Sequence, residues 1–559
     1  MKNERYLITL LMAVLITAVL ILPACAQQAP ATPTESKPSA TTPMTTSPSA
    51  PAAKPASSPS PTAKPATSPT QSATGGQQYG GTLTILYTSV VPALGTPWEA
   101  DNTNFYRSAI PALETLLTND NAERIQPRLA ESWKIAPDAK SITFNLRKGV
   151  KFQDGTDFNA EAVKFNLTSW PAGSSGKTML RYVTSVDVVD PYTVRLNLTQ
   201  YDALLMLRLS QSTVGMMVSP TAAKKATTTA TQVLDHMVGT GPFKVTEWVR
   251  DDHLKYVKWD GYWQKGKPYL DAIIIQNFAD STTRDIAFKA GGGQYAGPIT
   301  GTVPNDMKKS GFQVDKSSLV QVGCLMPSGG NPNSPFANKL VREAVCYALD
   351  TKAIAEGVGF GWWWADYQFA SDDSPNYNPD LKPRLHNLNK AKQLLAEAGY
   401  AKGFKTKLIG ETRGSNDLLV AIQTYLKEAG IDATLDKQDT VKFTSTYKGG
   451  WDGLLISGFP TPINVTGLVS RFGTASDYVS VSRPPGFMDK WDAVCLQTDD
   501  GIRASQIQQL VTMIYDDIIA IPVYHSSSMK ASNGKVHDIS WVDRGNPSYW
   551  DPANVWLSK

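Results

Sequence analysis

The stretch 141–165 places three local structural signals within 25 residues. Apolar and polar residues alternate from Ile142 to Leu146, which predicts a strand with one buried face. Residues 153–156 (Gln-Asp-Gly-Thr) predict a turn in which Gly155 can adopt a positive φ. Asn159 then stands where its side chain can cap a helix that begins at the next residue. We therefore expect strand, turn and capped helix in succession, and no catalytic group among them.

The length of the chain bounds its organisation. At 559 residues it exceeds what a single hydrophobic core supports, so we expect two or more domains. The formal net charge is +4, and no long run of basic residues occurs. Because nucleic-acid binding requires a concentrated basic surface, the sequence predicts no nucleic-acid partner.

The first 25 residues have the three parts of a secretion signal. Lys2 and Arg5 form a short positive region, Leu7–Leu22 is apolar, and small residues lead to Cys25. This arrangement resembles a bacterial lipoprotein signal (1–25), in which Cys25 receives the lipid and becomes the first mature residue. An uncleaved anchor helix is the alternative. In either case we expect an extracytoplasmic body that is held at the cell membrane.

Residues 26–78 consist almost entirely of Ala, Pro, Ser, Thr, Gln and Gly, and contain no aromatic residue. Such a composition offers nothing to bury against the entropy of ordering. Repeated proline favours an extended chain of about 3 Å per residue. We therefore predict a disordered tether between the anchor and the body.

Cysteine and histidine give no sign of a metal or a catalytic centre. With Cys25 assigned to lipid, Cys324, Cys346 and Cys495 remain, without the spacing of metal ligands. Buried free thiols are the favoured interpretation, and a Cys324–Cys346 disulfide is the alternative. The histidines are scattered and no nucleophile-elbow motif occurs. We expect no metal, no cofactor and no catalytic residue, although two carboxylates could still meet in space, which leaves an enzyme as a remote alternative.

Several blocks of the sequence resemble one protein family. Residues 143–163 resemble the segment T-F-x-L-R-K-G-V-K-F-x-D-G-T-x-F-x-A-E-D-V, with departures at Gln153 and Ala162. Residues 127–133 and Val238–Phe243 resemble P-x-L-A-E-S-W and V-G-T-G-P-[YF]. These are signature blocks of the family 5 extracellular solute-binding proteins, the receptors of peptide- and nickel-type ABC importers.

The resemblance implies a two-lobed α/β fold of the periplasmic-binding-protein kind (type II, cluster C), with an extra subdomain inserted in the first lobe. It places lobe I at 79–122, 238–330 and 529–559, the insert at 123–237, and lobe II at 331–528. Members bind a solute between the lobes without catalysis, and the closed form docks on a membrane permease. We expect such a receptor to be a monomer.

Three consecutive indoles, Trp362, Trp363 and Trp364, form the strongest aromatic signal. They cannot all face one core on a helix or on a strand, so at least one should be exposed or line a cavity, where an indole suits ligand contact. The alternative is a loop that plugs the edge of a lobe. The resemblance, which brings this segment near the cleft, favours ligand contact.

Two further positions follow from the resemblance. Arg413 comes after a predicted strand, as does the arginine with which dipeptide-binding members grip the peptide carboxylate. Ser457–Pro462 replaces the segment S-G-W-x-x-D, whose aspartate anchors the peptide amine; Phe459 stands for the tryptophan, and no aspartate is present. Because a buried ammonium needs a carboxylate partner, either another acid serves or the ligand is not an ordinary free-amine peptide. The second interpretation is favoured.

Together these features predict a lipid-anchored receptor of an ABC importer that captures a peptide or peptide-like solute. Trp362, Trp363, Trp364, Arg413 and Phe459 are the candidate ligand contacts. The alternative solute is an oligosaccharide or a nickel chelate, and a signalling receptor or an enzyme is a remote alternative.

Overall fold

In the computed structural model the largest sheet of the body has the strand order β15-β14-β16-β12-β17-β11-β1-β10-β9-β8, with β13 paired to β17. The structure describes residues 76–88, 94–100, 103–120, 124–225, 233–370, 372, 374, 376–460, 472–473, 477–539, 542–543 and 548–559. The predicted lipoprotein signal with Cys25, and the tether up to residue 75, lie outside this part of the chain. No helix among the described residues is both long and apolar enough to cross a membrane.

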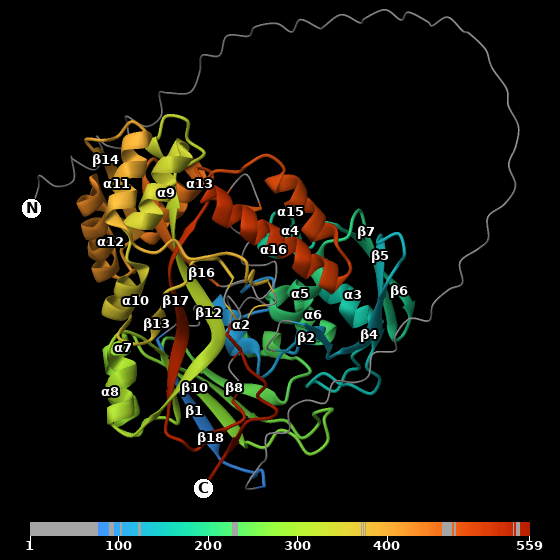
Figure 1. Cartoon of the computed structure of the whole chain (residues 1–559). Coiled ribbons are helices and arrows are strands. Elements are labelled where there is room, and N and C mark those ends of the chain that lie inside the picture. Colours follow the sequence, from blue (N-terminus) through green and yellow to red (C-terminus); the bar gives the residue numbers. More distant parts are fainter. Residues whose placement is uncertain are drawn as a thin grey trace, which may run out of the picture. The chain divides into compact units, whose positions relative to one another are not determined.

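The strands of the large sheet come from both ends of the chain. Their bounds are β1 Thr82–Tyr87, β8 Phe243–Val249, β9 His253–Lys258, β10 Ala272–Asn277, β11 Tyr295–Ile299, β12 Gln313–Pro327, β13 Trp363–Trp364, β14 Phe404–Glu411, β15 Ile431–Gln438, β16 Leu454–Pro460 and β17 Ile521–Ser532. β12 and β17 are long, antiparallel neighbours that join the strands β8–β11 and β1 to the strands β14–β16 (Figure 1). The sheet therefore runs through both predicted lobes along two strands.

The predicted insert contains a separate four-stranded antiparallel sheet. Its order is β4-β5-β7-β6, with bounds Ala130–Ile135, Ser141–Leu146, Thr193–Leu198 and Val183–Asp190. Ile142, Phe144 and Leu146 are buried on one face of β5, as the alternation predicts. Small two-stranded sheets pair β2 Leu117–Asn119 with β3 Ile125–Pro127, β18 Val536–His537 with β21 Trp556–Leu557, and β19 Val542–Asp543 with β20 Ser548–Tyr549.

The turn and the helix that follow β5 also form as predicted. Gly155 has φ +86°, which a residue with a side chain rarely adopts. Asn159 caps α3 (Ala160–Thr168), because its Oδ1 accepts a 3.0 Å hydrogen bond from the backbone N–H of Ala162. Gln153, in contrast, is more than a turn residue: its buried side-chain amide donates to the carbonyls of Gly241 (3.0 Å) and Phe243 (2.8 Å). It fastens the insert to the start of β8.

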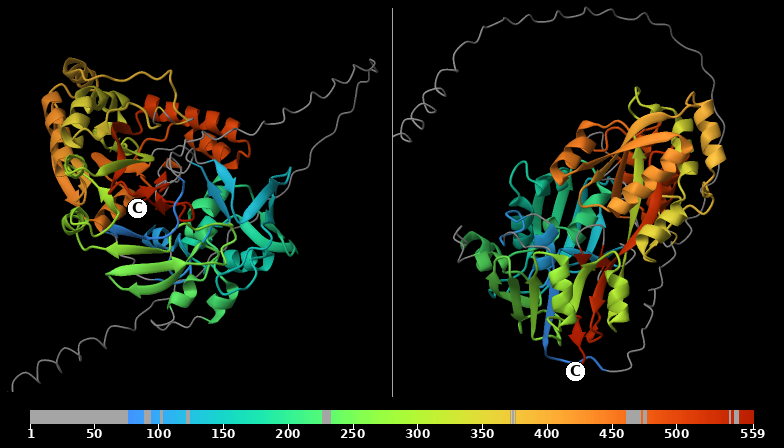
Figure 2. Two further views of the ribbon diagram at one scale, coloured as in Figure 1. Left: turned by 90° about the horizontal axis from the view of Figure 1, so that it is seen from below. Right: turned by 90° about the vertical axis from the view of Figure 1, so that its left-hand side faces the viewer.

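Helices surround both sheets. Their bounds are α2 Thr103–Ala109, α4 Ser175–Met179, α5 Ala203–Gln211, α6 Pro220–Lys225, α7 Ser281–Lys289, α8 Val303–Lys309, α9 Lys339–Ala348, α10 Thr351–Gly359, α11 Leu388–Glu397, α12 Asn416–Ala429, α13 Thr440–Gly449, α15 Phe487–Leu496 and α16 Asp500–Asp517. Short 3₁₀ turns occupy Thr213–Gly215, Val233–Met237 and Pro335–Ala337. Helices α9–α12 share a hydrophobic core with β14–β16, and the two views of Figure 2 show this group apart from the four-stranded sheet.

The described cysteines are free thiols, so the favoured interpretation of Cys324 and Cys346 is confirmed. Both are buried, whereas Cys495 is half-buried. Burial raises the pKa of Cys346 to about 12 and that of Cys324 well above its ordinary value. Both thiols therefore stay protonated and unreactive at neutral pH.

Candidate ligand-binding cavity

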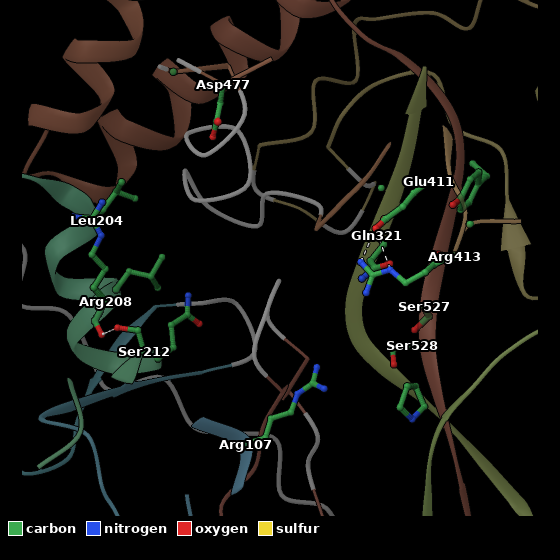
Figure 3. Close-up of a pocket in the computed structure, with 18 of the residues that line it drawn as sticks. Arg107, Leu204, Arg208, Ser212, Gln321, Glu411, Arg413, Asp477, Ser527 and Ser528 are labelled. Carbon is green, nitrogen blue, oxygen red and sulfur yellow. Dashed lines mark hydrogen bonds and ion pairs between the residues drawn. The ribbon is translucent and has the colours of Figure 1, made fainter. Parts of the chain in front are cut away.

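A cavity of about 1770 Å³ opens beside β12 and β17. Small-molecule pockets usually measure about 300–1,000 Å³, so this cavity has room for an oligopeptide-sized solute with water. α2, α4, α5 and α15, which packs on α5, line one side, and the end of β14 and the loop 412–415 line another (Figure 3). Side chains from 107 to 529 contribute, which brings residues from the insert to residues of predicted lobe II.

The central strands present hydroxyl, amide and aromatic groups to the cavity. Gln321 of β12 and Ser526, Ser527 and Ser528 of β17 lie along its wall. Tyr524 lines it too, and burial, with a smaller contribution from Cys324, raises the pKa of this phenol to about 12. The tyrosine therefore keeps its proton at neutral pH. The wall as a whole can form hydrogen bonds with a polar solute.

The three indoles do not all face one space: Trp362 and Trp363 line the large cavity, and Trp363 also borders a second one together with Trp364. Trp363 and Trp364 form β13, which pairs with Ser526 and His525 of β17. Trp363 lines the cavity and stacks on Tyr524, with ring centroids 3.9 Å apart and planes inclined by 10°. Trp364 does not line this cavity; it lines a second one of about 460 Å³ on the lobe II side of β13. The expectation that the indoles cannot share one environment fits this arrangement.

Trp362 lines the cavity but is almost fully buried. It is 6 % exposed, and its indole Nε1 donates a 3.1 Å hydrogen bond to Oδ1 of Asn305. The ammonium of Lys308 lies over the ring, 4.6 Å from its centroid. These contacts fix Trp362 between α8 and β13, so it supports the wall.

Arg413 lines the cavity at the end of β14, as the resemblance predicts, but its guanidinium has a partner within the chain. Its Nη2 lies 2.7 Å from Oε1 of Glu411, and the side chain is 72 % exposed. Figure 3 shows this ion pair beside Gln321. A ligand carboxylate would compete with Glu411 for Arg413.

Phe459 does not line the cavity. It is fully buried and packs against Phe369, with ring centroids 5.9 Å apart, and edge-on against Phe472 and Tyr478. Neighbouring residues of a strand point to opposite faces. Gly458 faces the cavity, so the next side chain turns into the core. Phe459, which stands where the family segment has a tryptophan, therefore lies beneath the cavity wall.

Several charged residues that line the cavity could not be recognised as ligand contacts from the sequence. Arg107, Arg208, Asp477 and Asp492 come from α2, α5, a loop and α15. Arg107 and Arg208 are 101 residues apart, and Arg208 and Asp477 are 269 apart, so no local motif could have joined the arginines to the carboxylates. The serine run 526–528, which follows an apolar strand, is the one local signal that pointed to a polar wall.

Groups of three or more metal-ligating side chains (His, Cys, Asp or Glu) are absent from the described residues. None of the described residues that line the large cavity is a histidine. What the cavity offers is charge, hydroxyl groups and aromatic surface, which suits reversible binding of a polar organic solute.

Residues 124–479 match the family described as bacterial extracellular solute-binding proteins, family 5. The chain belongs to this family. Its relatives include the glutathione-binding protein GsiB of Shigella flexneri, 32 % identical over 372 residues, which are 64 % of this chain and 71 % of that protein. This membership confirms the predicted family and makes the chain a solute-binding protein of the ABC-transporter type.

Solved structures of the family share the fold. The periplasmic binding protein DppA of Helicobacter pylori, in complex with the peptide STSA, superposes with a TM-score of 0.69 at 22 % identity, covering 86 % of this chain and 99 % of that one. NikA of Brucella suis, in complex with Fe(III)-EDTA, gives a TM-score of 0.73 at 22 % identity, covering 85 % and 100 %. The predicted two-lobed α/β fold is thereby confirmed.

Proposed function

We propose that this family 5 protein is the extracytoplasmic receptor of an ABC importer that captures a peptide or peptide-like solute in the 1770 Å³ cavity. The observation that carries the proposal is the cavity wall, where hydroxyl and amide groups of β12 and β17 lie between arginine and carboxylate side chains. A peptide offers matching backbone donors and acceptors and charged ends. The peptide complex of DppA and the glutathione-binding relatives support this solute class.

In this proposal Cys25 carries the lipid, the proline-rich segment holds the body away from the membrane, and the loaded monomer delivers its solute to a permease. Trp363 and the serines of β17 contact the solute. The wild-type protein should incorporate labelled fatty acid in the cell, and a Cys25→Ser variant should not; label retained by that variant would contradict lipid anchoring at Cys25.

The structure changes the balance between the solute classes. The missing aspartate of the segment 457–462 favoured a solute without a free amine, but Asp477 and Asp492 bring carboxylates to the same cavity from elsewhere. The second candidate is a metal chelate rich in carboxylates, which the arginines of the cavity would suit and which the chelate complex of NikA illustrates.

A thermal-shift panel tests the proposal. A ligand that binds only the folded state raises stability by about 2.7 kcal/mol at a hundred times its Kd. Di- and tripeptides, glutathione, nickel- and iron-chelate complexes and oligosaccharides should be compared at equal concentration. We expect peptides or glutathione to raise the melting temperature. A shift with chelates or sugars alone would contradict the proposed solute class.

A further inference from the structure

The charged residues that line the cavity form two groups of opposite excess charge. Around α2 and α5 there are three arginines and one carboxylate; we call this group the arginine wall, and it comprises Arg107, Arg181, Arg208 and Asp202. The other group has three carboxylates and one arginine from β14, the loops and α15, which packs on α5; we call it the acidic wall, and it comprises Glu411, Asp477, Asp492 and Arg413. The cavity therefore offers both signs of charge to a solute.

Within the arginine wall Arg107 alone forms no hydrogen bond or ion pair with another residue that the structure describes. Asp202 lies 2.9 Å from Nη1 of Arg208 and 3.7 Å from Nη2 of Arg181, so it serves both. Arg208 also donates to the carbonyl of Met179. Nε of Arg107 is buried without a hydrogen-bond partner among the described residues. A buried guanidinium nitrogen without an acceptor is costly, and a ligand carboxylate would supply that acceptor in a bidentate pair.

Within the acidic wall the pairing is again unequal. Oε1 of Glu411 accepts from Arg413 at 2.7 Å and from the hydroxyl of Thr440 at 2.6 Å. The carboxylates of Asp477 and Asp492 form no hydrogen bond or ion pair with another described residue. Figure 3 shows Asp477 directed into the cavity from the top of the view and Arg107 from the bottom. Two unpaired groups of opposite charge thus face the same space.

We infer that Arg107 and Asp477 are the charge anchors of the cavity: Arg107 binds a carboxylate of the solute and Asp477 its ammonium group. The inference rests on the proposed function and narrows it to solutes that carry a free amine and a free carboxylate. It assigns the solute carboxylate to Arg107 and not to Arg413, whose charge Glu411 neutralises.

Blocked peptides test the two anchors separately. Trialanine, N-acetyl-trialanine and trialanine amide are titrated by calorimetry into the wild-type protein and into Arg107→Gln and Asp477→Asn. Losing one charged hydrogen-bond partner should weaken binding by about 10- to 100-fold. We expect Asp477→Asn to weaken trialanine but not its N-acetyl form, and Arg107→Gln to weaken trialanine but not its amide.

Matched controls come from the exposed ion pair Arg195–Asp187, on the sheet of the insert. Arg195→Gln and Asp187→Asn should bind all three peptides as the wild type does. Thermal melts of every variant establish that it is folded.

The outcomes separate the inference from the proposed function. If the wild-type protein binds none of the three peptides and no glutathione, the proposed solute class fails and the inference fails with it. If the wild type binds trialanine but Asp477→Asn and Arg107→Gln weaken free and blocked peptides alike, or not at all, only the charge anchors are wrong. If Arg413→Gln, and not Arg107→Gln, weakens the binding of trialanine without weakening that of its amide, the assignment of the charge anchors is also wrong.

Discussion

Glu114 shows how much of this fold depends on a single buried side chain. Glu114 is 1 % exposed, and its carboxylate accepts hydrogen bonds from Thr240 (2.9 Å), Tyr262 (2.9 Å) and Trp263 (2.8 Å). It also lies 3.2 Å from Nε of Arg128. Burial lowers the pKa of this guanidinium, but the neighbouring carboxylates of Glu114 and Asp551 outweigh burial, so the pKa is raised.

Replacing Glu114 by Ala should destabilise the body strongly. The change removes the carboxylate nearest to the Arg128 charge and the acceptor of three donors, and breaking a buried ion pair in this way costs about 3–5 kcal/mol. Urea unfolding followed by tryptophan fluorescence measures the loss. Glu131→Ala is the control, because Glu131 pairs with Arg147 at the surface (3.3 Å, half exposed) and should cost less than about 1 kcal/mol. Equal losses in the two variants would contradict the role of Glu114.

At the same scale, the candidate ligand residues show what the sequence could and could not reveal. Trp363 and Arg413 both line the cavity, where the aromatic run and the family resemblance had placed them. Phe459 does not, because the alternation of the strand turns it away from Gly458. Arg107 and Asp477 gain their significance only from the absence of partners, which is a property of the folded chain and of no sequence pattern.

Among the elements, the strand, turn and helix of 141–165 could be predicted closely because each is determined by neighbouring residues. Their contacts to other parts of the chain could not be predicted in this way. Asp154, in the turn, accepts hydrogen bonds from Thr156 (2.6 Å) and from the hydroxyl of Ser219 (2.5 Å), which lies 65 residues further on. Burial tends to raise the pKa of Asp154, but the hydrogen bonds from Ser219 and Thr156 outweigh it and lower the pKa below its ordinary value.

The lowered pKa gives stability a defined pH dependence. A carboxylate whose pKa is lower in the folded state contributes stability above its ordinary pKa, and loses it as the pH falls through the folded value. Asp154→Asn should therefore cost about 1 kcal/mol at pH 7, and the difference from wild type should shrink below about pH 4. Denaturant melts at both pH values measure this. A difference that stays constant between them would contradict the account of the turn.

On the scale of the whole molecule, the largest sheet of the body contains two long strands, β12 and β17, that join the parts that line the cavity. α/β alternation and the family blocks predicted this class of fold. The cavity itself could not be predicted, because its walls combine residues from 107 to 529. The lobe and insert boundaries remain predictions of the sequence.

The central claim is that the solute occupies this cavity, and calorimetric titration of a cavity-blocking variant tests it most directly. Gly458 of β16 faces the cavity, and a Cβ built on it meets nothing within 4 Å, so Gly458→Trp fills the space without displacing the backbone. Gly357→Trp is the control, since this glycine is exposed on α10, outside the cavity, with equally open surroundings. We predict one peptide bound per wild-type and per Gly357→Trp molecule, and no measurable binding to folded Gly458→Trp. Unchanged binding to Gly458→Trp would place the solute elsewhere and contradict the account.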